Sequence, residues 1–160
     1  MSNEGPKARV EPLLKLNFLS HGTIECKDLE RARRFYEELL GLEVVQTSAV
    51  SLQLRLNSAT TITCVKAAGE NKGSVLNHFG FDVVTRDEVN DAYEIVMAHK
   101  HDYGILKLTK PAEQHGSYSF YIQDADGNFW EILTNPPGGY SYLFEKGEQT
   151  KTWSKQRSTT

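Results

Sequence analysis

Residues 19–26 read LSHGTIEC, and residues 76–83 repeat the same pattern as LNHFGFDV. Each copy has Leu, a small polar residue, His, two further residues, and then an apolar, an acidic and an apolar residue. The offset between the copies, which takes His21 to His78, also takes Tyr36 to Tyr93. The pattern therefore predicts a duplicated unit in which two histidines occupy equivalent positions on two strands.

Composition places the chain among compact single-domain proteins. It has 160 residues, of which 39% are hydrophobic, enough for one domain with a substantial core. The net charge of −3 does not favour nucleic-acid binding, which normally needs a basic surface. No apolar run approaches the roughly 20 residues of a membrane span, and the N-terminus lacks a signal-peptide layout. We therefore expect a cytoplasmic protein.

The segment that follows the first copy predicts one helix and three strands. The first copy itself lies in a predicted strand, 18–26. Asp28 is a suitable helix N-cap, apolar residues follow it at helical spacing, and Gly41 is expected to end the helix. Three short strands are predicted next, and residues 51–56 alternate polar and apolar as a half-buried strand does. These three strands are 43–47, 51–56 and 61–66.

The same order recurs after a polar linker at residues 67–74. The predicted elements are a strand at 76–84, a helix from 87 to about 100, and strands at 105–110, 117–123 and 129–134, with a tight turn at 124–127. The expected fold is α+β, with two βαβββ modules that form a curved mixed sheet around a metal-binding cleft. The modules span residues 17–67 and 75–135 of one domain, 17–144, between a flexible leader, 1–16, and a flexible tail, 145–160.

Three side chains suit a divalent metal. His21 and His78 are paired by the repeat, and Glu131 lies near the end of the second copy. Two histidines and one carboxylate form a ligand set that suits Fe(II), Mn(II) and similar ions. Trp130 should face away from the cleft by strand alternation. The two cysteines, Cys26 and Cys64, lie in apolar segments and are expected to be buried thiols without a disulfide.

At these residues the chain resembles the vicinal oxygen chelate superfamily, which includes glyoxalase I, type I extradiol dioxygenases, epimerases and fosfomycin-resistance proteins. The resemblance covers roughly residues 18–135. The segments that carry it are His21, 28–36 (DLERARRFY), 40–42 (LGL), 76–78 (LNH) and 120–132 (FYIQDADGNFWEI). The resemblance implies that His21, His78 and Glu131 hold the metal.

The residues around these ligands separate the branches of the superfamily. Glyoxalase I and the epimerases use a fourth ligand, Glu or Gln, where this chain has Thr63. Three ligands leave open metal positions, as in extradiol dioxygenases, whose signature places a tyrosine ten residues before the last glutamate. Tyr121 meets that spacing, and His115, only six residues before Tyr121, is a candidate acid–base group. Ala125 replaces the usual proline of the turn.

Fosfomycin-resistance enzymes also use two histidines and one glutamate, and Thr23 follows His21 as it does in them. They hold a phosphonate with cationic side chains. The corresponding stretch here, residues 111–114, reads PAEQ, and Tyr140 stands where a basic residue is expected. This branch therefore fits less well than the dioxygenases.

We expect an Fe(II) dioxygenase of the extradiol ring-cleaving type, acting on a catechol-like substrate and O₂, with Tyr121 and His115 as catalytic residues. The alternatives are a glyoxalase-like isomerase, lyase or thiol transferase that uses Mn(II), Ni(II) or Zn(II), and a non-catalytic protein that binds a drug or metabolite. A homodimer is expected. Residues 140–144 are rich in aromatic side chains and fit either a cleft cover or a subunit interface. Whether the modules pair within one chain or across a swapped dimer stays open.

Overall fold

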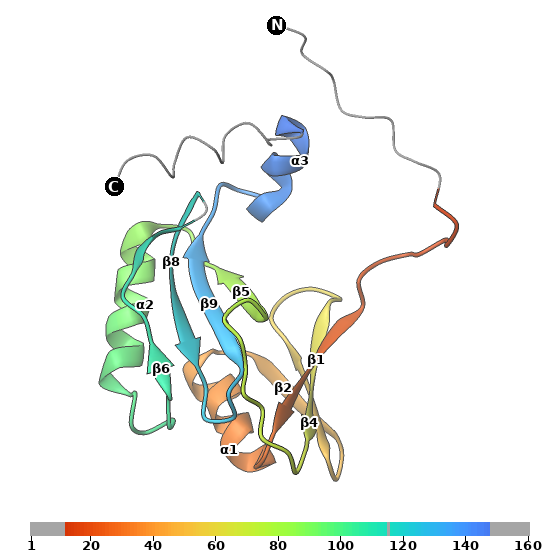
Figure 1. The fold of residues 1–160 in the computed structure, drawn as a ribbon, viewed down its shortest axis with the longest axis vertical. Helices are drawn as coiled ribbons and strands as arrows, with labels where there is room; N and C mark the ends of the chain where they lie inside the picture. Colours follow the sequence, from red (N-terminus) through yellow and green to blue (C-terminus); the bar gives the residue numbers. More distant parts are fainter. Residues whose placement is uncertain (1–11, 115, 148–160) are drawn as a thin grey trace, which may run out of the picture. The chain divides into compact units, whose positions relative to one another are not determined.

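The computed structural model describes residues 12–114 and 116–147 of the chain. The fold divides into two compact units, and residues 17–134 form the larger one (Figure 1). The smaller unit contains a short 3-10 helix, η2 (Gly139–Ser141), and a helix, α3 (Tyr142–Lys146). Most of the predicted leader, 1–16, and tail, 145–160, lies outside the described residues. None of the described helices is long and apolar enough to cross a membrane.

The first module has the predicted order of strand, helix and three strands. Its elements are β1 (His21–Cys26), α1 (Leu29–Arg34), the π-helical η1 (Phe35–Leu39), β2 (Glu43–Ser48), β3 (Ser51–Arg55) and β4 (Thr61–Lys66). The sheet has the order β1-β4-β3-β2, and only the β1–β4 pair is parallel. The predicted single helix thus ends in a π-helical turn, in which the Leu40 N–H donates to the Phe35 carbonyl oxygen.

The second module repeats this order and adds one strand. Its elements are β5 (His78–Asp82), α2 (Arg86–Ala98), β6 (Lys107–Leu108), β7 (Ala112–Gln114), β8 (Ser117–Gln123) and β9 (Phe129–Thr134). The predicted strand 105–110 is cut to the two residues of β6, and β7 was not predicted. Pro111 stands between β6 and β7, and a proline lacks the N–H that a continuous ladder needs.

Local capping explains where the helices begin. The Asp28 carboxylate accepts hydrogen bonds from the backbone N–H groups of Glu30 and Arg31, at 2.9 and 3.0 Å, as an N-cap residue does. Thr85 and Glu88 form a reciprocal capping box at the start of α2, one residue before the predicted start. Gly41 has φ of +69°, which allows the chain to turn sharply after the first helix.

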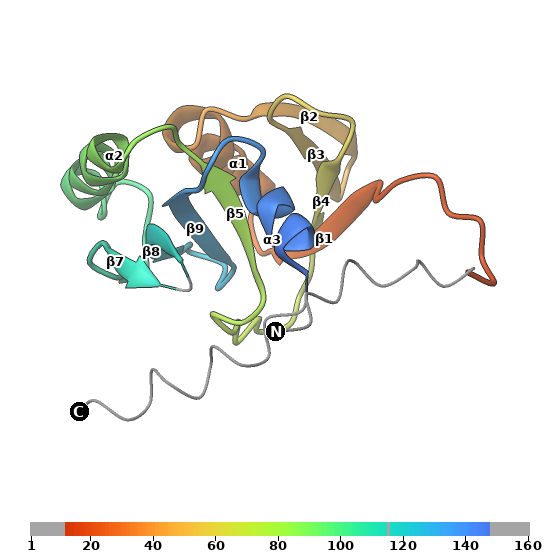
Figure 2. The same ribbon diagram turned by 90° about the horizontal axis from the view of Figure 1, so that it is seen from above.

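The strands of the two modules form two separate mixed sheets, and the second sheet has the order β5-β9-β8-β6 with β7 also paired to β8. Figure 2 shows the two sheets side by side, with α2 against the strands of the second module. The absence of a side chain at Gly22 lets β1 approach β5, because a Cβ there would lie 2.6 Å from the Phe79 ring.

One hydrophobic core joins the modules. Trp130 is fully buried, stacks on Phe81 with the ring centroids 5.7 Å apart, and meets the edge of Tyr36 at 5.5 Å. Trp130, which was expected to face away from the cleft, thus packs in this core. Cys26 and Cys64 are buried free thiols, as expected.

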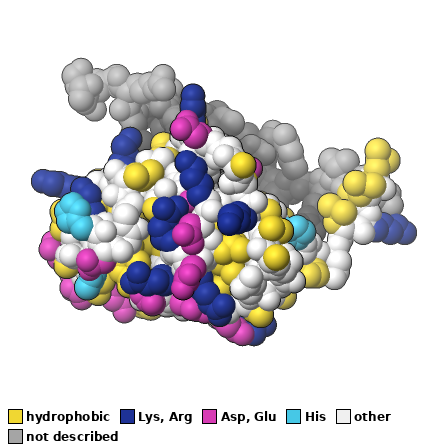
Figure 3. Space-filling model, turned by 90° about the horizontal axis from the view of Figure 1, so that it is seen from below, with side chains coloured by type: hydrophobic (Ala, Val, Ile, Leu, Met, Phe, Trp, Pro, Cys, Tyr) yellow, Lys and Arg dark blue, Asp and Glu magenta, His cyan; other side chains and the backbone are white. Residues whose placement is uncertain are grey.

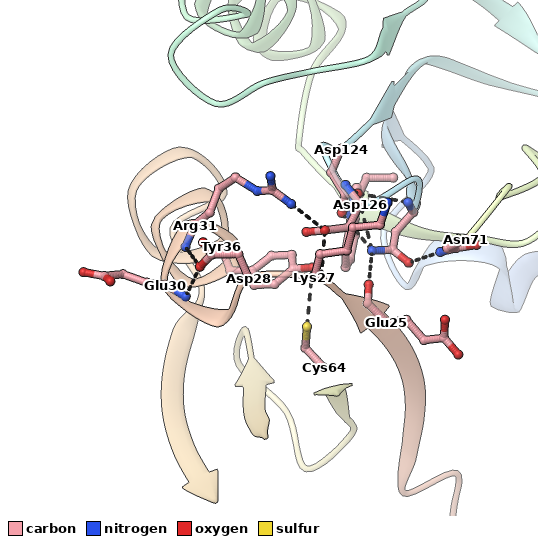
Figure 4. A network of polar contacts seen from close by, with 12 residues as sticks. Glu25, Lys27, Asp28, Glu30, Arg31, Tyr36, Cys64, Asn71, Asp124 and Asp126 are labelled. Carbon is pink, nitrogen blue, oxygen red and sulfur yellow. Dashed lines mark hydrogen bonds and ion pairs between the residues drawn. The ribbon is translucent and has the colours of Figure 1, made fainter. Parts of the chain in front are cut away.

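A polar network ties the β8–β9 turn of the second module to the first module (Figure 4). The Asp124 carboxylate accepts hydrogen bonds from Trp130 Nε1 at 3.0 Å and from the Asn128 backbone N–H at 2.9 Å. Burial raises the pKa of Asp124, while these hydrogen bonds act in the opposite direction. Asp126 binds Arg31 Nη2 at 2.6 Å, and Asn128 Nδ2 donates to the Glu25 carbonyl oxygen at 2.9 Å. The acidic turn is therefore a structural junction.

Candidate metal centre

Adjacent strands of the second sheet place His78, Tyr121 and Glu131 on one face. Glu131 of β9 lies directly opposite Tyr121 of β8, and it is two residues beyond the partner of His78 of β5. The His78 and Tyr121 rings meet edge to face, with their centroids 5.1 Å apart. Three of the predicted site residues are thus brought together by the β5-β9-β8 order, which the sequence alone did not specify.

His78 and Glu131 form a pair suited to holding a cation. His78 Nε2 lies 3.1 Å from Glu131 Oε2, and the Glu131 residue is only 5% exposed. His78 Nδ1 lies 2.5 Å from the Val75 carbonyl oxygen. A carbonyl can only accept, so Nδ1 carries the proton, and in a neutral imidazole Nε2 presents its lone pair to the carboxylate. Two electron-rich atoms that face each other this way need either a proton or a metal between them.

Two further residues on this face were not predicted. Gly80 lies opposite Glu131, and a Cβ there would lie 3.8 Å from Glu131 Oε2 and 3.1 Å from a Leu133 methyl group. The missing side chain therefore leaves room beside the carboxylate. Ser119 is fully buried, and its Oγ has no hydrogen-bond partner in the described part of the chain. Ser119 precedes Tyr121 by two residues, so strand alternation was the signal that could have identified it.

His21 lies on the other sheet, at the start of β1. Its ring Nδ1 is 2.7 Å from Ser20 Oγ, and the residue is exposed. No three His, Cys, Asp or Glu side chains are grouped for metal binding within residues 12–114 and 116–147. The structure therefore brings together His78 and Glu131 but does not group His21 with them, and His21 stays a predicted ligand.

Polar side chains lie on the strands beside His21. Thr61 pairs with His21 across the β1–β4 ladder, and Thr63 pairs with both Thr23 and Gln53. Gln53 Nε2 donates to Thr61 Oγ1 at 2.5 Å, and Thr63 Oγ1 donates to Gln53 Oε1 at 3.0 Å. Thr63, which the resemblance predicts to stand where the glyoxalase branch has its fourth ligand, is thus hydrogen-bonded to the Gln53 amide.

The other predicted site histidine, His115, lies outside the described residues, so its catalytic role stays a prediction. His99 caps the end of α2, and its Nδ1 lies 3.0 Å from Asp102 Oδ2 on the surface.

On the face drawn in Figure 3, positive and negative side chains are interspersed, without a large area of one sign. That face has none of the basic character of a nucleic-acid interface.

Comparison with known proteins identifies the family. The model of the Glyoxalase/Bleomycin resistance protein/Dioxygenase superfamily matches residues 18–132. The chain belongs to this superfamily. The match confirms the predicted resemblance, and it spans both modules, from β1 to most of β9.

Individual members of the superfamily differ in their reactions. A probable trivalent organoarsenical cleaving enzyme of Bacillus subtilis is 28% identical over 128 residues, which cover 71% of this chain and 77% of the relative. The fosfomycin resistance protein of Listeria monocytogenes has a TM-score of 0.64 and 18% identity, covering 81% of this chain and 99% of that one. Lactoylglutathione lyase from Agrobacterium tumefaciens has a TM-score of 0.60 and 19% identity, covering 78% and 98%. The two structural likenesses show the shared fold.

Proposed function

We propose that this protein is a divalent-metal-dependent enzyme that acts on a small molecule with two adjacent oxygen atoms. His78 and Glu131 would hold the metal, together with His21. The observation that carries this proposal is the contact of 3.1 Å between His78 Nε2 and Glu131 Oε2, with Nδ1 engaged by the Val75 carbonyl. Such an outer partner fixes the tautomer and orientation of a metal-binding imidazole.

The surrounding residues fit a metal-bound substrate. A metal held by these residues would supply a Lewis acid that polarises substrate oxygens. Gly80 leaves space beside the Glu131 carboxylate. The Tyr121 ring packs against His78 on the same sheet face, and this contact supports Tyr121 as a candidate proton donor.

We propose that the third ligand comes from a second copy of the chain. The described residues of one copy contain no group of three donors, while His21 lies on an exposed polar strand face. A symmetric dimer would bring the β1 face of one copy to the β5-β9-β8 face of the other and create two equivalent sites. This arrangement would make both the metal site and the activity depend on dimer formation.

Mixing two inactive variants tests this arrangement. His21→Ala and His78→Ala homodimers should each lack metal. In a mixed dimer, one site would have lost both histidines, while the other would keep His78 and Glu131 of one copy and His21 of its partner. Unfolding and refolding an equal mixture should therefore restore about one quarter of the wild-type metal content, since random pairing makes about half the dimers mixed. No recovery in a mixture that sedimentation shows to be dimeric would contradict the shared site.

Among metal-dependent reactions, we favour ring cleavage of a catechol-like substrate. This reaction takes up one O₂ per ring and places one oxygen atom on each carbon of the broken bond, so it needs a substrate chelated through two oxygens. The three-ligand set and the spacing from Tyr121 to Glu131 support it. An oxygen electrode should record stoichiometric uptake when the Fe(II)-loaded protein meets a suitable catechol. If the protein holds one iron per site but consumes no O₂ with any of a broad set of catechols, this reaction is excluded.

The relatives offer a second candidate, a lyase-type or transferase reaction in which the metal polarises a carbonyl or epoxide oxygen. Its support is the lactoylglutathione lyase and fosfomycin resistance folds. Cleavage of an organoarsenical has weaker support in this chain. Trivalent arsenic is a soft centre that prefers thiolates, and both cysteines are buried, at 2% and 0% exposure. Product analysis with a methylglyoxal–glutathione adduct, with no O₂ consumed, would favour the lyase reaction.

A further inference from the structure

A cavity of about 570 Å³ lies beside His78 in the larger unit. Its volume is in the range of about 300 to 1,000 Å³ that is usual for small-molecule sites. His78 forms part of its wall, so the cavity adjoins the proposed metal centre. The rest of the wall comes from β1, the inter-module linker and the β8–β9 turn, through residues 23–25, 70–74, 77–79 and 127–129.

Hydrogen bonds and close packing hold the linker in place as a wall. Asn71 Nδ2 donates to Asn128 Oδ1 at 2.8 Å, and Asn71 Oδ1 accepts the Gly73 backbone N–H at 3.0 Å. Gly73 has φ of +44°, and a Cβ at this position would overlap the Gly127 carbonyl oxygen. The linker is therefore seated against the turn, and this part of the cavity is preformed in the free chain.

The wall combines polar side chains with the apolar ones of Ile24, Phe79 and Phe129, and it carries an excess of negative charge. Glu25 and Glu70 contribute carboxylates, and Lys72 contributes one ammonium group, a sum of −1. All three are exposed, and none of them forms an ion pair within residues 12–114 and 116–147. The neutral polar side chains of the wall are those of Thr23, Asn71, Ser74, Asn77 and Asn128.

We infer that this cavity receives the substrate arm that extends beyond the metal-chelating group, and that Glu25 and Glu70 select a cationic arm over an anionic one. The inference rests on the proposed function, because it takes the chelating group to lie at His78 and Glu131. A neutral or amine-bearing arm finds hydrogen-bond partners in the amides and hydroxyls of the wall. A carboxylate or phosphonate arm meets two like charges, of Glu25 and Glu70, against the single opposite charge of Lys72.

Three catechols, two of them with arms of matched length, test the selectivity. Dopamine and dihydrocaffeate carry the same ring and a two-carbon arm, ending in an ammonium and a carboxylate respectively, and unsubstituted catechol has no arm. Binding of each to the Mn(II)-loaded protein is measured by calorimetry without oxygen, so that no turnover is needed. Dopamine should bind about 3- to 10-fold more tightly than dihydrocaffeate, since exposed charge pairs each contribute modestly.

Variants assign the selectivity to the cavity. Glu70→Gln should lower the dopamine-to-dihydrocaffeate preference by about 2- to 5-fold, and Lys72→Gln should raise it by a similar factor. Glu94→Gln is the matched control, because it removes the same charge from an exposed position on α2. Equal binding of the two arms, or equal effects of Glu70→Gln and Glu94→Gln, would overturn the inference while catechol binding upholds the chelating site. Absence of binding by all three probes would refute the chelating site, and the arm inference with it.

Discussion

At the scale of single residues, the main chemical feature of the second sheet is the contact between the His78 and Glu131 side chains. A carboxylate that is 5% exposed is costly to bury without a partner. His78 Nε2 lies 3.1 Å from this carboxylate. Because Nδ1 donates its hydrogen bond to the Val75 carbonyl oxygen, a proton or a metal ion between Nε2 and Glu131 would stabilise both atoms at once.

Removal of either member of this pair should abolish metal binding and leave the fold intact. His78→Ala and Glu131→Ala each leave too few anchors for tight retention. Glu131→Ala also relieves the burial of a carboxylate, so the metal-free melting temperature should not fall by much. Elemental analysis after gel filtration and thermal melts by circular dichroism measure the two effects. If a variant still binds as much metal as the wild type, the substituted residue is not a ligand.

Tyr121→Phe should separate chemistry from metal binding. The substitution keeps the ring against His78 and removes only the hydroxyl, so metal content should stay at the wild-type value. If Tyr121 moves a proton in the reaction, turnover should fall by roughly 10²-fold or more. Full turnover with metal bound would assign Tyr121 to packing alone and leave proton transfer to His115 or to water.

At the scale of elements, the caps that begin the helices make stability depend on pH. The backbone N–H of Arg31 donates to Asp28, and together with the N–H of Glu30 it lowers the pKa of this carboxyl below its usual 3.8. A lowered pKa in the folded state means that the carboxylate stabilises the protein above pH 3.8, and that this contribution is lost as the pH falls through the folded pKa.

Asp28→Asn keeps an N-cap acceptor but removes the titration. The wild type should therefore melt at a higher temperature than Asp28→Asn near neutral pH, and the difference should shrink below about pH 4. Thermal melts of both proteins across this range measure it. Asp91→Asn, at an exposed position inside α2, serves as the control for a lost surface charge. A difference that stays constant down to about pH 2 would contradict the capping assignment.

At the scale of the whole larger unit, the linker and the β8–β9 turn hold the two modules together. Gly127 has φ of +90°, and a Cβ there would overlap the Asn71 carbonyl oxygen. Gly41 also has a positive φ, of +69°, but no atom lies within 4 Å of its missing Cβ. An alanine at Gly41 would therefore introduce backbone strain alone, whereas an alanine at Gly127 would introduce backbone strain together with steric overlap.

Gly41→Ala should lower the free energy of unfolding by about 1–2 kcal/mol, the cost of a left-handed conformation for a residue with a Cβ. Gly127→Ala should lower it by at least about 2 kcal/mol more, because the linker must also move away. Urea titrations measure both. Since the linker lines the cavity, Gly127→Ala should also weaken dopamine binding, while Gly41→Ala should not. Equal losses of stability in the two variants would show that the linker moves aside without a cost in free energy.

The sequence by itself determined the features that depend on neighbours along the chain. The cap at Asp28, the stop at Gly41 and the alternation in β3 are local patterns, since each reflects hydrogen bonds or burial within a few residues. The repeat of the histidine motif predicted two modules of the same design. The family followed from a resemblance carried by the motifs at 28–36, 40–42, 76–78 and 120–132, and the same resemblance implied His21, His78 and Glu131 as metal ligands.

Only the tertiary structure decided what depends on register and packing between distant residues. The pairing of β5 with β9 brings His78 to Glu131, while His21 lies on a separate sheet. The unpartnered Ser119 hydroxyl and the space at Gly80 became visible only once the strands were aligned. The linker had no predicted role, yet it forms one wall of the cavity beside His78. No local pattern encodes such placements, because they arise from contacts across more than fifty residues of chain.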